Sequence, residues 1–196
     1  MSTQLDKVQP KNRVQLEQLI DYAFKHNIYD LNFIDTSKIT DMSNLFANCE
    51  YDIDVSNWDV SNVTNMYNMF YCCKNFDCDL SNWNVSNVTD MYSMFTACEN
   101  FKGKGLDNWD VSKAEDMRFM FYNCKNFNCD LSNWDMSKAL RINEMFYGCK
   151  NFEGKGLENW KLEKTLFYYD IFTGCDKVKL PSWYKAFLKR CNLEFF

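Results

Sequence analysis

The residues of this chain that could carry chemistry are its ten cysteines and a set of aspartates at recurring positions. Zinc-binding cysteines often occur as C-x-x-C pairs, with two residues between them. Cys73 and Cys78 are five positions apart, as are Cys124 and Cys129, and the chain has no C-x-x-C pair. We therefore expect neither a metal site nor any other cofactor.

Groups suited to catalysis are few. The single histidine, His26, falls at the end of an expected helix, where exposure at a helix terminus explains it. The two Gly-Lys-Gly segments lack the spacing of a phosphate-binding loop. Asp59, Asp110 and Asp135 each follow a tryptophan and could form a row of carboxylates, but like charges without a cation repel. A turn residue that caps its own backbone is the better interpretation, and we predict that the chain is not an enzyme.

Composition narrows the classes of function. The chain has 196 residues, of which 46% are apolar and 17% aromatic, and its net charge is −5. An acidic chain does not offer the basic stripe that phosphate neutralisation requires, so nucleic acid is not the expected partner. No apolar stretch approaches the ~18 residues of a membrane span, and the first residues show no secretory signal. We expect a cytoplasmic protein with reduced thiols, or a secreted or cell-surface protein if a signal has been removed.

A repeat of 25 or 26 residues organises the chain. Five tryptophans recur at this spacing, and a phenylalanine follows each by twelve residues and a cysteine by fifteen. The repeated positions are Trp58, Trp83, Trp109, Trp134 and Trp160, then Phe70, Phe95, Phe121, Phe146 and Phe172, then Cys73, Cys98, Cys124, Cys149 and Cys175. An earlier, partial copy supplies Phe46 and Cys49. One repeat cannot bury such large side chains by itself, whereas stacked copies can, with like residues lying over like.

A period of 51 residues is superposed on the shorter one. Every second repeat has one extra residue and two glycines, which are Gly103 and Gly105 in one copy and Gly154 and Gly156 in the next. Glycine adopts a positive φ at little cost, so these positions predict a bulge or turn that absorbs the insertion. The alternation indicates duplication of a two-repeat unit.

The pattern within a repeat predicts one short helix and one short strand. Val88, Met91, Met94, Phe95 and Cys98 have the spacing of one helix face, and the serine three residues after a tryptophan is a candidate N-cap. The segment that leads to the next tryptophan is short and reads as extended. The predicted fold class is an α/β repeat solenoid, a right-handed, leucine-rich-repeat-like stack of about six strand-helix repeats with helical caps at both ends.

The two ends of the chain lack the full repeat. Residues 12–26 carry apolar side chains on one helical face and suit a cap over the first repeat. Pro181 precedes an expected terminal helix, SWYKAFLKRCNLEFF, with Trp183, Phe187 and Leu188 turned inward. The predicted divisions are an N-terminal capping helix and first rung at 1–33, repeats at 34–178, and a C-terminal capping helix at 179–196.

The repeated motif resembles that of BspA-like leucine-rich repeat proteins over roughly residues 31–178. The motif reads SNWDVSNVTNMYNMF at 56–70, SNWNVSNVTDMYSMF at 81–95 and DNWDVSKAEDMRFMF at 107–121. This resemblance implies a right-handed solenoid with one strand and one helix per turn. It also implies a role as a bacterial surface protein or adhesin.

Aromatic residues occupy positions that the packing pattern leaves free, and these mark the expected partner-binding surface. They are Tyr67, Tyr71, Tyr92, Phe119, Tyr122 and Tyr147. Partial burial along the stack would explain such residues equally well. A competing surface contains Asp54, Asp79 and Asp130, whose negative charge would suit a basic partner.

The predicted function is a non-enzymatic protein–protein interaction scaffold that binds a macromolecular partner through the solenoid surface. Two alternatives stay open. One is a secreted or cell-surface adhesin, which the family resemblance favours. The other is an inhibitor encoded by a phage or other mobile element that blocks a host enzyme or defence protein, which the small size and acidic charge motivate.

Overall fold

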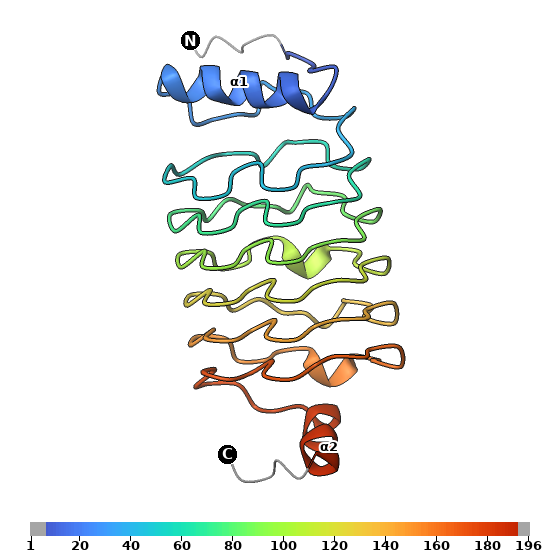
Figure 1. The fold of residues 1–196 in the computed structure, drawn as a ribbon. Coiled ribbons are helices and arrows are strands. Elements are labelled where there is room, and N and C mark those ends of the chain that lie inside the picture. Colours follow the sequence, from blue (N-terminus) through green and yellow to red (C-terminus); the bar gives the residue numbers. More distant parts are fainter. Residues whose placement is uncertain (1–6, 192–196) are drawn as a thin grey trace.

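The structure, a computed structural model, describes residues 7–191. Figure 1 shows successive turns of the chain stacked in layers, with helix α1 (Arg13–Lys25) across one end and helix α2 (Ser182–Arg190) at the other. Two short 3₁₀ helices, η1 (Leu106–Asn108) and η2 (Leu157–Asn159), lie within the layers. Neither α-helix of the described chain is long and apolar enough to cross a membrane.

The predicted α/β solenoid of about six strand-helix repeats is wrong. Residues 7–191 contain no continuous β-strand. Their β structure consists of isolated parallel bridges, such as Asp90 to Asp116 and Asp116 to Arg141. Within the repeats that the structure describes, the only helical turns are η1 and η2. The descriptions of the chain as a leucine-rich repeat protein and as a solenoid are therefore wrong as well.

Runs of tight turns take the place of the predicted helices. We call these runs the first to sixth turn segments, and they comprise residues 41–49, 65–73, 90–98, 116–124, 141–149 and 167–175. In the third segment the backbone N–H groups of Met94, Thr96 and Cys98 donate to carbonyls three residues earlier, at 3.2, 3.1 and 3.0 Å. Each segment is thus a succession of β-turns, and its apolar residues fall at spacings that resemble a helix face.

A second, alternating set of N–H groups in a segment binds the next layer. In the third segment these donors are Met91, Ser93, Phe95 and Ala97, which donate to the carbonyls of Asp116, Arg118, Met120 and Tyr122 at 2.7–2.9 Å. Because bonds within the segment alternate with bonds to the next layer, no run of i to i−4 bonds can form. Positive φ angles at Ser93 (52°) and Ala97 (58°) interrupt the helical conformation as well.

The large repeated side chains stack in register inside the layers, as the spacing of the repeat predicts. The rings of Trp83 and Trp109 lie 6.3 Å apart and within 2° of parallel. Phe95 and Phe121 lie 5.7 Å apart and within 3° of parallel. The indole N–H of Trp83 donates to the carbonyl of Val55 in the layer before at 3.0 Å, so this buried polar group is satisfied.

The paired glycines have the positive φ that the insertion predicts. Gly103 and Gly105 have φ angles of 88° and 90°, and Gly154 and Gly156 have angles of 77° and 89°. Gly105 immediately precedes η1, and Gly156 immediately precedes η2. The extra residue of every second repeat is therefore absorbed in a glycine turn followed by one turn of 3₁₀ helix.

Helix α1 begins where Asn12 accepts a hydrogen bond from the backbone N–H of Gln15 at 3.0 Å, as an N-cap residue does. Its residues Leu16, Ile20 and Ala23 are buried against the first layers. Val14, which the pattern also placed on the inner face, is 60% exposed.

Helix α2 continues the core of the stack. Trp183 extends the tryptophan column, with its ring 6.2 Å from that of Trp160 and its indole N–H donating to the carbonyl of Leu157 at 2.8 Å. Phe187 and Leu188 pack partly buried against the core. Tyr184, which the sequence pattern did not single out, is the buried residue of this helix. The last residues of the predicted terminal helix, 192–196, lie outside the described chain.

Candidate interaction surface

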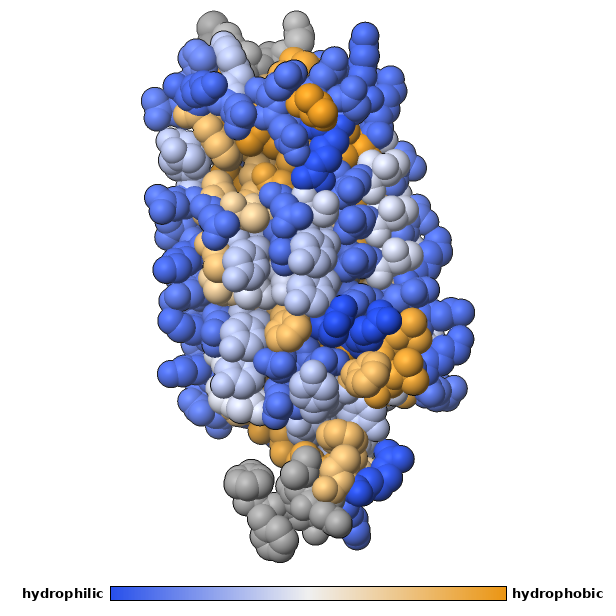
Figure 2. All heavy atoms as spheres, in the orientation of Figure 1, coloured by the Kyte–Doolittle hydropathy of each residue, from blue (hydrophilic) through white to orange (hydrophobic). Residues whose placement is uncertain are grey.

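A continuous line of aromatic rings crosses four layers on one face of the stack. Tyr67 stacks on Tyr92 with ring centroids 5.0 Å apart, and Tyr92 meets the edge of Phe119 at 5.5 Å. Phe119 meets Tyr122 at 5.9 Å, and Tyr122 stacks on Tyr147 at 4.8 Å. We call these five rings the aromatic row. Ring side chains are visible in vertical lines over the middle layers in Figure 2.

The turn geometry explains why these side chains reach the surface. Tyr67 and Tyr92 stand two residues after Asn65 and Asp90, which form β-bridges between layers. Tyr122 and Tyr147 come directly after the buried phenylalanines of their segments. Successive layers repeat the same backbone bonds, so side chains at equal positions in the turn lie one above another. The predicted partner-binding residues are therefore brought together, with one exception.

Tyr71 is the exception. It is 36% exposed, but none of the ring contacts found among residues 7–191 includes it. Thr96 occupies the equivalent position in the layer between those of Tyr71 and Tyr122. The Tyr71 ring is therefore separated from that of Tyr122 by a layer without an aromatic ring at this position. Tyr71 thus lies on the same face but outside the aromatic row.

Charged side chains border the row, and the sequence pattern did not reveal them. The guanidinium of Arg118 lies 4.9 Å from the centre of the Tyr92 ring and is paired with Asp116 at 2.6 Å. Together with Tyr67 and Asp90 they line a shallow cavity of about 290 Å³. Burial raises the pKa of the Asp90 carboxyl, and the nearby Asp116 adds to this effect. The sequence did indicate a charge here, because Arg118 occupies the repeat position that Tyr67 and Tyr92 occupy in earlier layers.

An apolar group adjoins this border. Leu166 and Phe167, at the start of the sixth layer, are 68% and 50% exposed, and Tyr169 is also exposed. Apolar side chains gather beside a charged group on the lower part of this face in Figure 2. Here the repeat has lost its usual residues, so the pattern gave no expectation for Leu166 and Phe167, whereas Tyr169 falls at the outward position of Tyr67 and Tyr92.

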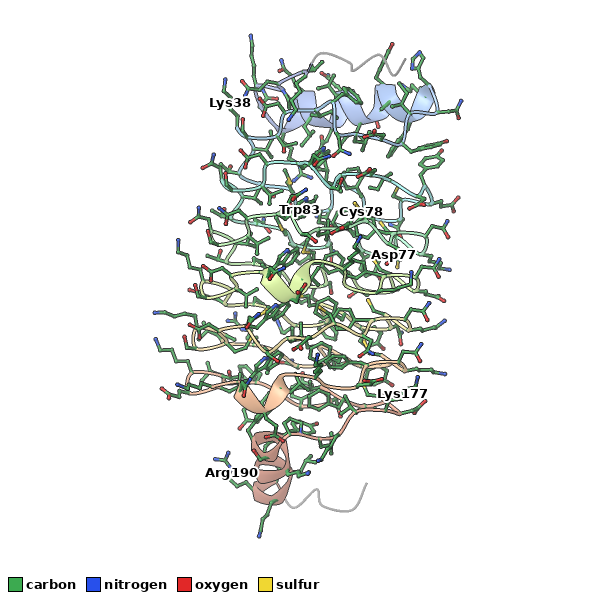
Figure 3. All side chains as sticks on the ribbon, turned by 180° about the vertical axis from the view of Figure 1, so that it is seen from behind. Lys38, Asp77, Cys78, Trp83, Lys177 and Arg190 are labelled. Atoms are coloured by element: carbon green, nitrogen blue, oxygen red, sulfur yellow. The ribbon has the colours of Figure 1, made fainter. Side chains whose placement is uncertain are left out.

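The competing acidic surface is largely neutralised. Asp79 pairs with Lys104 at 2.7 Å, Asp130 pairs with Lys155 at 2.6 Å, and Asp77 pairs with Lys102. The hydrogen bond from its lysine, with help from the neighbouring serine, lowers the pKa of Asp79, and likewise of Asp130, to about 2. These lysines belong to or adjoin the Gly-Lys-Gly insertions. Figure 3 shows Asp77 toward one side of the stack, with Trp83 nearer the middle.

The remaining aspartates have the structural role that their positions suggest. The side chains of Asp59, Asp110 and Asp135 accept hydrogen bonds at 3.0, 3.0 and 2.9 Å from the backbone N–H two residues later. These are Asx turns, in which the carboxylate caps its own loop. His26 is exposed at the end of α1 against Tyr22, and no group of three or more metal-binding side chains is found among residues 7–191.

The cysteine column satisfies backbone groups inside the stack. The thiols of Cys98, Cys124 and Cys149 lie 3.0, 2.8 and 2.9 Å from the carbonyls of Phe70, Phe95 and Phe121, one layer back. All three are buried, and burial raises the pKa of each thiol well above its ordinary value. Burial likewise raises the pKa of Cys73 to about 12.

We expect alkylation to separate this column from the surface thiol. At pH 8 the buried thiols stay protonated, and only a thiolate reacts readily with iodoacetamide. Mass spectrometry of the native protein should show modification at the exposed Cys191 first, and at Cys98, Cys124 and Cys149 only after denaturation. Disulfides within the column of freshly prepared protein, or native labelling of the column as fast as Cys191, would contradict this expectation.

Comparison with known proteins identifies a family but no individual relative. Two overlapping segments, residues 14–105 and 87–184, match the family described as "Mycoplasma protein of unknown function, DUF285". Neither the curated proteins nor the solved structures compared with the chain gave a match. The predicted membership of the BspA-like leucine-rich repeat family is wrong, because the family that matches is this one and no leucine-rich repeat family does.

Proposed function

The chain belongs to the family of Mycoplasma proteins of unknown function termed DUF285, and we propose that this member is a non-enzymatic module that binds another protein through the aromatic row. The observation that carries the proposal is the continuity of the row. Five rings from four layers contact one another in an unbroken line while remaining at the surface. Tyrosine supplies a large contact area at a low cost in side-chain entropy, which is why binding surfaces are rich in it.

Packing within the layers does not require these tyrosines. The position of Tyr67 is occupied by Ser43 in one layer and by Asn143 in another. Both layers form the same backbone bonds, since the N–H groups of Asn44 and Glu144 donate to the next layer as that of Asn68 does. Tyrosine at these positions is therefore not needed for the fold and contributes aromatic surface instead.

The border of the row indicates the chemistry of the partner. Asp90, Asp116, Arg118 and Arg141 place charges of both signs at the border of the row, and Arg141 lies 3.5 Å from Asp116. A mixed border of this kind suits a protein surface with polar groups around an apolar centre. The net charge of −5 argues against nucleic acid, whose phosphates would need a basic surface.

Two sets of substitutions test the proposal. The first replaces Tyr67, Tyr122 and Tyr147 by serine, and the matched control replaces Asp79 and Asp130 by asparagine. A partner captured from the cells that produce the protein, and then purified, should bind the tyrosine variant at least about tenfold more weakly and the control variant unchanged. The unfolding midpoint of both variants shows whether the fold is retained. An unchanged affinity of the tyrosine variant, with salt-dependent weakening in the aspartate variant, would place the partner on the acidic surface instead.

A further inference from the structure

The hydrogen bonds between layers follow one rule until the last layer. In each of the first five turn segments, alternate backbone N–H groups donate to carbonyls of the segment that follows. In the fifth segment these donors are Ile142, Glu144, Phe146 and Gly148, at 2.8–3.1 Å from the carbonyls of the sixth. The sixth segment receives these bonds and forms its own turns, because Thr173 and Cys175 N–H donate to Asp170 and Phe172 carbonyls.

The equivalent donors of the sixth segment have no next layer. They are the backbone N–H groups of Tyr168, Asp170, Phe172 and Gly174, and no acceptor for them exists among residues 7–191. We call them the open edge. A backbone N–H group that is left without an acceptor away from water loses the free energy of a hydrogen bond. The edge is therefore a preformed row of donors at the spacing at which each earlier turn segment binds the turns of the next layer.

A cavity lies along this edge. Its volume is about 610 Å³, and the edge residues Asp170, Phe172 and Gly174 form one of its walls. Leu180, Tyr184 and Leu188 form the opposite, mainly apolar wall. In Figure 1, α2 lies beneath only part of the last layer.

The other end of the stack is closed. The carbonyls of Asp41 and Ser43 in the first turn segment accept hydrogen bonds from the guanidinium of Arg13 in α1. Helix α1 lies across that end (Figure 1). A second copy of the chain therefore cannot continue the stack by placing its first layer on the open edge.

We propose that the open edge binds a segment of a partner protein that adopts the run of tight turns of an additional layer. Alternate carbonyls of the segment accept hydrogen bonds from Asp170, Phe172 and Gly174, and its apolar side chains enter the cavity between the edge and Leu188. A free anion fits less well than a neutral backbone carbonyl, because the carboxylate of Asp170 lines the same cavity. This site lies at the end of the stack and is independent of the aromatic row.

A peptide taken from the chain itself is a suitable probe. Residues 90–98 accept four such bonds in the structure, from Met66, Asn68, Phe70 and Cys72 N–H. A synthetic peptide of this sequence, acetylated and amidated at its ends, is titrated into the isotope-labelled full-length chain. We expect the amide resonances of Asp170, Phe172 and Gly174 to shift, and their hydrogen exchange to slow at least tenfold in the complex. A scrambled peptide should cause neither change.

Two variants locate the site. Leu188→Arg places a charge in the cavity and should weaken peptide binding at least tenfold. Ala186→Arg places the same charge at an exposed position of the same helix and should leave the affinity within twofold. Amide spectra of both variants show whether the layers are intact.

Three results would overturn the proposal. The first is failure of the peptide to bind, because its backbone is one that an identical edge accepts in the stack. The second is binding that leaves the three edge amides unchanged. The third is protection of those amides in the free full-length chain that disappears when the chain is shortened to end at Cys191, because the edge would then be occupied by the chain's own end.

Discussion

Replacement of Trp109 by alanine should lower the free energy of unfolding by about 4 kcal/mol, within the range for removal of a large buried ring. Trp109 is 2% exposed, and its ring lies 6.3 Å from that of Trp83 and 6.3 Å from that of Phe95. Its indole N–H also donates to the carbonyl of Leu80 at 3.3 Å. Denaturation by urea, followed by fluorescence or circular dichroism, measures the loss.

Trp183→Ala provides the matched comparison. Trp183 ends the tryptophan column, is partly exposed, and stacks on Trp160 alone in that column. The loss there should be about half as large, roughly 2 kcal/mol, since less apolar surface is uncovered. Equal losses at the two positions would show that the extent of ring burial does not determine the cost of removing a tryptophan from the column.

Gly105→Ala should destabilise the chain by about 2–5 kcal/mol. The φ of 90° strains any residue with a Cβ by about 1–2 kcal/mol. A Cβ at this position would also lie 2.2 Å from the backbone nitrogen of Ser81 in the layer before, and the chain must move to relieve this overlap, which adds about 1–3 kcal/mol. The unfolding midpoint in urea tests the prediction.

Gly174→Ala separates the two causes. Gly174 has a similar positive φ of 74°, but a Cβ there would meet its nearest atom, the Cα of Gly148, at 3.3 Å. Only the backbone strain and a slight adjustment apply, so a loss of about 1–2 kcal/mol is expected. If Gly105→Ala costs no more than Gly174→Ala, the close approach between layers is not a constraint.

The register of the stack could be predicted from the sequence, whereas the local structure within a layer could not. Equal residues at a fixed spacing must lie over one another, and Trp83 and Trp109 do. The helix prediction was wrong because Val88, Met91, Met94, Phe95 and Cys98 are buried by successive turns that mimic helical spacing. The positive φ angles of Ser93 and Ala97 distinguish the turns from a helix. Serine and alanine do not predict a positive φ from the sequence, whereas glycine does.

The candidate site was predictable only in its repeated part. The column that contains Tyr67 and Tyr92 is visible as a recurring position, so its exposure could be expected. The continuity of the row depends on Phe119, which adopts a positive φ of 57° at a position where the other layers have asparagine, serine, glutamate or aspartate. The open edge could not be predicted, because it depends on which N–H groups point to the next layer, and side-chain patterns do not encode this.

The closed first layer and the open last layer have an electrical consequence. Most peptide units that link two layers present their carbonyl toward α1 and their N–H toward α2, as the unit between Asp90 and Met91 does. A peptide unit has a dipole of about 3.5 D, and aligned units add head to tail. Fewer bonds run in the reverse direction, such as Thr89 N–H to Thr64 carbonyl, so a net dipole remains along the stack. Its negative pole lies at Arg13 and its positive pole at Asp170, and both side chains carry the charge that stabilises the pole beside them.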